Sequence, residues 1–136
     1  MRPRLLIVAS VALGALIAMR SVPAHAHHSF AAEFDASKPI TLKGTVMQID
    51  WTNPHVWFYV QVKDDEGKNV RWACEMGAPH QLQQRGWLRD TMKIGDVVTV
   101  VGSLARDGTR RANARTVMTA DGKTLGAASS GPSSQQ

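Results

Sequence analysis

The alternation of apolar and polar residues along this chain predicts five β-strands. It is clearest over residues 56–62, where Val56, Phe58 and Val60 fall on one face of the expected strand. The expected strands span residues 40–51, 56–62, 70–76, 97–102 and 111–119. Gly44 inside the first strand predicts a bulge or a bend. Residues 97–102 are apolar on both faces, which predicts a strand buried on both sides.

A short helix is predicted between the third and fourth strands. Residues 79–88 begin with Pro79, a residue favoured in the first helical turn, and Leu82 and Trp87 follow at helical spacing. Three strands, a helix and a final two-stranded hairpin follow one another in the chain order of an OB-fold barrel. We therefore expect an all-β fold with one short helix, arranged as a five-stranded OB-fold-like barrel. A simple meander barrel is the alternative.

The start of the chain has the pattern of a cleaved signal peptide. A basic start is followed by apolar residues 5–19, and Ala24 and Ala26 form a small-residue cleavage site. The apolar stretch is shorter than the roughly 20 residues that cross a bilayer. We expect a Sec-type signal peptide at residues 1–26, export to a bacterial periplasm and no stable membrane anchor after cleavage.

The remaining chain divides into three parts by composition. We expect a polar lead-in segment at residues 27–39, the barrel domain at residues 40–125 and a disordered tail at residues 126–136. The tail is expected because its residues are small and polar and offer little apolar surface to bury.

The net charge of the chain bears on which class of partner it can bind. The sequence has 16 Lys and Arg against 11 Asp and Glu, a formal net charge of +5. Three of the basic residues and none of the acidic ones lie in residues 1–26, which leaves a net charge of +2 after cleavage. Nucleic acid is therefore not expected as a partner. The last hairpin gathers four arginines, which indicate either a solvated face or a site for an anion: Arg106, Arg110, Arg111 and Arg115.

Cys74 is the single cysteine, so the chain has no intrachain disulfide. Because its neighbours have a strand pattern, we expect it to be buried as a small hydrophobic residue. A thiolate ligand and an intermolecular disulfide are the alternatives.

Histidines are the main candidates for chemistry. Cleavage after Ala26 would place His27 at the mature N-terminus, where an α-amine with a pKa of roughly 7.7–8.0 and an imidazole of roughly 6.5 can both bind a metal. His28 follows directly. Cleavage after Ala24 would put His27 at position three, which also suits Cu(II) or Ni(II). If a metal binds here, copper is the one to expect; the alternative is a solvated polar terminus without metal.

Two further histidines complete the possible metal ligands. His55 follows Asn53 and a proline in the loop between the first two strands, which in an OB-like barrel borders the binding face. Its alternative role is a hydrogen bond to the backbone of the turn. His80 stands at the expected start of the helix, either as a ligand or as a surface residue. The candidate metal ligands are therefore His27, His28, His55 and His80.

Four other residues are candidates for ligand binding: Asn53, Trp57, Tyr59 and Glu75. Trp57 and Tyr59 share one face of a strand, where they form either a stacking platform for a base or sugar or a cap on the barrel. Glu75 falls on the outward face of the third strand, as a carboxylate partner of the site or as a solvated residue.

No pattern for catalysis is evident. The sequence lacks a defensible Ser-His-Asp order, a Cys-x-x-Cys pair and a phosphate-binding glycine loop. An enzyme is therefore not the expected class.

Four segments carry a resemblance to a known family. They are H-H-S-F-A-A-E-F-D at 27–35, W-T-N-P-H-V-W at 51–57, R-G-W at 85–87 and G-D-V-V-T-V-V-G at 95–102. Together they resemble a family of small exported bacterial proteins of unknown function, the DUF6152 type, over nearly all of residues 27–125. The resemblance implies an exported, β-rich single domain with no assigned activity. It singles out the histidines already chosen at 27, 28 and 55.

The sequence thus favours an exported binding protein for an unknown small ligand, with copper or another metal bound through histidines as one form of it. An accessory module that binds another periplasmic protein without metal is the alternative. An oxidative copper enzyme is the second alternative.

Overall fold

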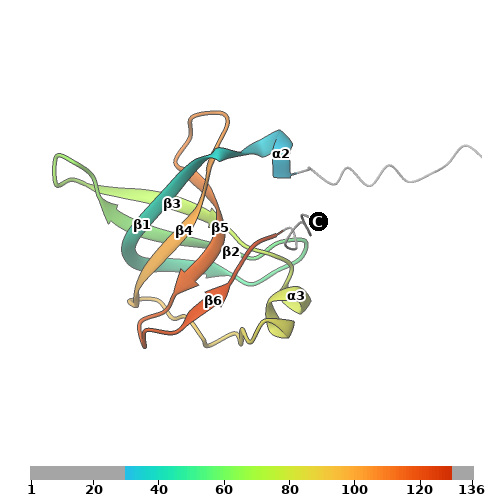
Figure 1. The fold of residues 1–136 in the computed structure, drawn as a ribbon. Coiled ribbons are helices and arrows are strands. Elements are labelled where there is room, and N and C mark those ends of the chain that lie inside the picture. Colours follow the sequence, from blue (N-terminus) through green and yellow to red (C-terminus); the bar gives the residue numbers. More distant parts are fainter. Residues whose placement is uncertain (1–29, 130–136) are drawn as a thin grey trace, which may run out of the picture.

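The computed structural model describes residues 30–129 (Figure 1). In chain order the elements are α2 (Phe30–Glu33), β1 (Phe34–Asp50), β2 (Trp57–Lys63), β3 (Asn69–Glu75), α3 (Pro79–Gln84), β4 (Val97–Ala105), β5 (Arg111–Met118) and β6 (Thr124–Gly126). The expected signal peptide and the histidines at 25, 27 and 28 lie outside the described residues. The fold class predicted from the sequence, all-β with a short helix between the third and fourth strands, is confirmed.

One sheet contains all the strands. Its order is β3-β2-β1-β4-β5-β6, with antiparallel neighbours throughout. A further, parallel pairing joins the end of β3 to the start of β5, with Ala73 opposite Arg111 and Glu75 opposite Asn113. Hydrogen-bonded pairing therefore runs from β3 through β2, β1 and β4 to β5 and back to β3.

Strand β1 begins earlier than the sequence predicted. It starts at Phe34 rather than at residue 40, because Phe34 is buried and pairs with Ala105 of β4. Residues 34–39 of the expected lead-in segment therefore belong to the sheet. At Gly44 the strand pairs with β2 on one side and β4 on the other, and an added Cβ would lie 2.6 Å from the backbone oxygen of Gln61. The bulge itself falls at Val46–Gln48.

The prediction that β4 is buried on both faces is wrong. Val98 and Val100 point into the core, whereas Val97 is 50% and Val101 37% exposed. A run of valines fits either arrangement, and only the layers of the fold decide whether the outer face is covered.

The helix α3 is shorter than predicted. It ends at Gln84, and Gly86 follows with a φ of 90°, a left-handed conformation that glycine adopts without strain at the end of a helix. Trp87 therefore lies beyond the helix, where it is nonetheless fully buried.

The expected tail also begins too early. Residues 124–126 form the added strand β6, and Ala127 is fully buried. The backbone oxygens of Gly126, Ala127 and Ala128 accept hydrogen bonds from Trp87, Gly77 and Arg85. Small side chains allow the segment to lie close to the elements that donate these bonds.

The core lies between the inward faces of the strands. Its largest fully buried side chains include Trp87, Phe34, Phe58 and Met76. Cys74 is buried there as predicted, and burial raises the pKa of its thiol to about 12. Within residues 30–129, no helix has the length and apolar character needed to cross a membrane.

Candidate functional site

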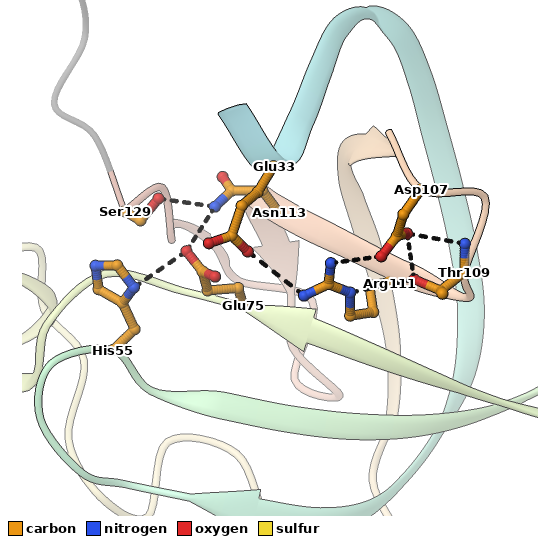
Figure 2. A network of polar contacts seen from close by, with 8 residues as sticks. All are labelled: Glu33, His55, Glu75, Asp107, Thr109, Arg111, Asn113 and Ser129. Atoms are coloured by element: carbon orange, nitrogen blue, oxygen red, sulfur yellow. Dashed lines mark hydrogen bonds and ion pairs between the residues drawn. The ribbon is translucent and has the colours of Figure 1, made fainter. Parts of the chain in front are cut away.

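His55 and Glu75 form the centre of the candidate site. His55 lies in the loop between β1 and β2, as predicted, and its Nδ1 is 3.2 Å from Oε1 of Glu75 at the end of β3 (Figure 2). The register of β2 and β3 sets Trp57 opposite Glu75, which brings the residues just before Trp57 to the end of β3. Backbone bonds between Val56 and the residues after Glu75 hold the loop there.

Two further polar residues complete the surroundings of the carboxylate. Asn113, opposite Glu75 in the parallel β3–β5 pairing, donates from Nδ2 to Glu75 Oε1 at 3.2 Å. The same nitrogen lies 2.7 Å from Oγ of Ser129. Glu75 is 6% and Asn113 3% exposed, so this network excludes most solvent.

The solvated role considered for Glu75 is therefore wrong. Its side chain lies on the outward face of β3, opposite to Cys74, as the alternation predicted. His55, Asn113 and Ser129 lie around it. The residues that cover Glu75 are distant from β3 in the sequence, so the alternation within β3 does not indicate that its outward face is covered.

Burial sets the electrostatics of Glu75. Desolvation is the main cause that raises the pKa of this carboxyl, and the negative charge of Glu33 adds to it. The charge of His55 and hydrogen bonds from Ser129 and Asn113 act in the opposite direction, and the net shift is upward. The carboxyl group thus holds a proton more readily than an exposed glutamate does.

A second polar group lies next to this pair, around Arg111 at the start of β5. Its guanidinium contacts Glu33 Oε2 at 3.4 Å and Asp107 Oδ2 at 2.9 Å. Figure 2 shows the Glu33 side chain between Arg111 and Glu75. The solvated face considered for the arginines is therefore wrong for Arg111, which is held in ion pairs, while Arg110 is exposed.

The geometry of His55 suits contact with a ligand. When Nδ1–H donates to Glu75, Nε2 carries the lone pair, and Figure 2 shows that atom on the side of the ring away from Glu75. The side chain is 34% exposed. A carboxylate that fixes the tautomer and orientation of an imidazole in this way is a common partner of metal-binding histidines.

The other candidate residues do not join this pair. His80 is exposed on α3, and Asn53 is exposed in the loop before His55. Trp57 and Tyr59 are half-buried on the outward face of β2, as predicted. The guanidinium of Arg71 lies 4.3 Å from the centre of the Tyr59 ring, so a cation already covers one face of it.

Within residues 30–129, no group of three or more His, Cys, Asp or Glu side chains is arranged to hold a metal. Among these residues, His55 and Glu75 form a contacting pair and belong to no such group. His27 and His28, the remaining candidate ligands, lie outside the described residues.

Sequence reasoning missed Asn113, Ser129 and Glu33. The Arg-Ala-Asn-Ala-Arg alternation of β5 places Asn113 on the face opposite to Ala112 and Ala114, which was a usable signal. Ser129 gave none, because it lies in a segment of small polar residues.

Comparison with known proteins adds a family and no activity. No curated protein and no solved structure matches the chain. A family model matches residues 15–114, a span that includes His55, Glu75 and Asn113 as well as the histidines at 27 and 28. Since this span covers most of the sequence, the chain belongs to the family of unknown function DUF6152.

Proposed function

We propose that this chain is an exported periplasmic binding protein in which His55 contacts the ligand. The observation that carries the proposal is the 3.2 Å contact between His55 Nδ1 and the buried carboxylate of Glu75. This contact orients Nε2 without involving it, so the imidazole is arranged for its ligand before binding. Preorganisation of this kind lowers the entropic cost of binding.

An OB-like barrel is the proposed architecture. Support comes from the cycle of pairings β1-β2-β3-β5-β4, from the parallel β3–β5 contact and from α3 between β3 and β4. In OB folds the β2–β3 face and the loop between the first two strands bind ligands. His55 lies in that loop, and Glu75 ends β3.

Copper is the proposed ligand. Imidazole and amine nitrogens suit it, and Cu(II) binds such donors more tightly than the other first-row divalent metals do. We assign His55 Nε2 as one ligand and the terminal amine of His27 with the imidazoles of His27 and His28 as the others. His80 is left out of this set because it is exposed on α3.

Copper titration of the mature protein tests this. The chain beginning at His27, with its N-terminus verified by mass, is titrated with Cu(II) and followed by electron paramagnetic resonance. We expect one copper per chain and a signal that changes in His55→Ala. Glu75→Gln should bind roughly 10–100-fold more weakly, because it loses the charge that orients the ring. His80→Ala is the matched control and should bind as the wild type does. An unchanged signal and affinity in His55→Ala would end the assignment.

An accessory module for another exported protein is the second candidate function. The outward side of β4 and β5 favours it, because Val97, Val101 and Met118 are exposed there. If this surface binds the partner, the wild type and His55→Ala should both capture it. The double variant Val97→Lys/Val101→Lys should not. Capture that survives these changes would exclude this surface.

A further inference from the structure

Within residues 30–129, the two most exposed large apolar side chains lie in one segment, the connection between α3 and β4. Ile94 is 70% and Leu88 63% exposed. Figure 1 shows this connection along the lower side of the barrel, where it runs from α3 to the start of β4. Exposed apolar side chains that gather in one place, with polar residues around them, are typical of an interaction surface.

Leu88 projects from a turn that hydrogen bonds hold in place. Its backbone N–H donates to Oγ1 of Thr91 at 2.8 Å, and the N–H of Thr91 donates back to the Leu88 oxygen at 3.1 Å. A shallow hollow beside Leu88 is lined by Ile49, Trp51 and Met92, so the apolar surface continues from this side chain toward the core. The exposure of Leu88 therefore belongs to an ordered turn.

Ile94 projects from a second turn of the same kind. The N–H of Asp96 donates to the Lys93 oxygen at 3.1 Å, and the N–H of Lys93 donates to Oδ2 of Asp96 at 2.9 Å. The turn is attached to β1, because the N–H of Val46 donates to the Asp96 oxygen at 2.8 Å. This bond brings the next residue of β1, Met47, which is 45% exposed, to the same turn.

Cations accompany both apolar side chains. Arg89 directly follows the first and Lys93 directly precedes the second, and both are exposed. Arg85, at the start of the segment, donates to a backbone oxygen after β6. Two acids share the segment: Asp90 is exposed, and the carboxylate of Asp96 accepts the hydrogen bond that closes its turn. Residues 85–96 thus have three cations against two acids.

We infer that the α3–β4 segment attaches the protein reversibly to the surface of an anionic lipid bilayer. Leu88 and Ile94 enter the interface between headgroups and acyl chains. Arg89 and Lys93 extend their apolar stems along them and bring their charges to the lipid phosphates. Trp51, half-buried beside Leu88, is of the residue type favoured at this depth.

The position of the apolar side chains favours a bilayer over a protein. Both project from turns and not from a flat face, and an acyl interface accepts a projecting side chain without a pocket of matching shape. A second copy of the chain would bring the cations of two such segments together, whereas lipid phosphates neutralise them. The attachment is independent of the copper assignment, and its failure leaves the proposed function unaffected.

Co-sedimentation with lipid vesicles tests this attachment. The chain without residues 1–26, its N-terminus verified by mass, is mixed without metal with vesicles of phosphatidylglycerol and phosphatidylethanolamine in equal parts, or of phosphatidylcholine alone. The apolar variant is Leu88→Ser with Ile94→Ser. Val101→Ser with Met118→Ser is the matched control, because it removes two exposed apolar side chains from the outward side of the sheet. Circular dichroism verifies the fold of each variant.

We expect the wild type and the control to bind the anionic vesicles, and the apolar variant to bind roughly tenfold more weakly or worse, because it buries less apolar surface. Arg89→Gln with Lys93→Gln and added salt should each weaken binding, since the first removes and the second screens the attraction to phosphate. Asp90→Asn should bind more tightly. If the wild type does not bind, if the apolar variant binds equally, or if phosphatidylcholine binds equally, the inference is wrong.

A fluorescent dye at position 88 measures insertion directly. Leu88→Cys is labelled with an environment-sensitive thiol dye, which reacts there selectively because Cys74 is buried and its thiol has a pKa of about 12. Its emission should shift to shorter wavelength with anionic vesicles, and the same dye on Val101→Cys should not shift. If the emission stays unchanged and sedimentation velocity shows dimers that the apolar variant does not form, the segment joins two copies and the bilayer assignment is wrong.

Discussion

The Oε1 atom of Glu75 lies 3.2 Å from Nδ1 of His55, although one residue ends a strand and the other lies in a loop before the preceding strand. The register of β2 and β3 produces this relationship, and Asn113 of β5 supports it from the opposite side. A buried carboxyl group with a histidine at its solvent side gives the protein a titrating centre whose effects can be measured.

The first prediction concerns the pH dependence of stability. Burial raises the pKa of Glu75 above its ordinary value of 4.5, so the folded state binds this proton more tightly than the unfolded state does. The contribution of Glu75 to the free energy of unfolding is therefore complete below about pH 4.5 and is lost as the pH rises through the folded-state pKa. Urea unfolding of the wild type and Glu75→Gln between pH 4 and 8 measures it. The free energy of the wild type relative to the variant should fall across this window and then level off.

A control of opposite sign is available at Asp107. Hydrogen bonds from the Thr109 side chain and backbone are the main causes that lower the pKa of this carboxyl. Its contribution is present above the ordinary value of 3.8 and is lost as the pH falls below it. Asp107→Asn should thus differ from the wild type in pH dependence only in the acid range. If the free energy of unfolding of the wild type relative to Glu75→Gln rises with pH, the pKa of Glu75 is not raised by burial.

The second prediction concerns Cys74. The thiol is fully buried, and its pKa of about 12 leaves almost no thiolate at neutral pH. Iodoacetamide at pH 8 should therefore leave the folded protein unmodified and alkylate it completely in urea. Mass spectrometry after each treatment checks this. Rapid alkylation of the folded protein would show that β3 opens near this residue.

The third prediction concerns Gly102 of β4. An added Cβ would lie 2.1 Å from the backbone oxygen of Asn113, so the two strands would have to separate. Gly102→Ala should lower the free energy of unfolding by about 1–3 kcal/mol or more, and it should also disturb the Asn113–Glu75 hydrogen bond. Gly126→Ala is the control, since its Cβ would meet only Arg85 Cδ at 3.7 Å. Chemical denaturation of both variants gives the comparison, and equal stabilities would contradict the close approach of β4 and β5.

The fourth prediction concerns the segment after β6. A chain that ends at Leu125 loses five hydrogen bonds: those of Gly126 with Trp87, Ala127 with Gly77 and with Arg115, Ala128 with Arg85 and Ser129 with Asn113. At about 0.5–1.5 kcal/mol for each hydrogen bond, the loss should be roughly 2.5–7.5 kcal/mol. A chain that ends at Ser129 retains all five and is the control. Thermal unfolding of the two chains measures the difference, and equal midpoints would show that this segment does not support the fold.

The sequence by itself determined the succession of β1 to β5 along the chain, and it determined which face of most of these strands is buried. Alternation with a period of two identifies which residues of β2 point inward, and the turn residues around His55 mark the loop. These are local properties, since each depends on residues that are adjacent in the chain. The position of His55 before β2 and the burial of Cys74 followed from the same local pattern.

Only the tertiary structure decided what covers each outward face. Glu75 and Val101 both point away from the core, yet Glu75 is 6% and Val101 37% exposed. The difference arises because His55, Asn113 and Ser129 lie around Glu75, whereas within residues 30–129 Val101 on the outer side of β4 stays partly exposed. The parallel β3–β5 pairing that brings Asn113 to Glu75 joins residues far apart in sequence, and no local pattern encodes such a contact. Residues adjacent in the sequence therefore determine the strands, whereas the candidate site forms only when strands distant in the sequence pair in the correct register.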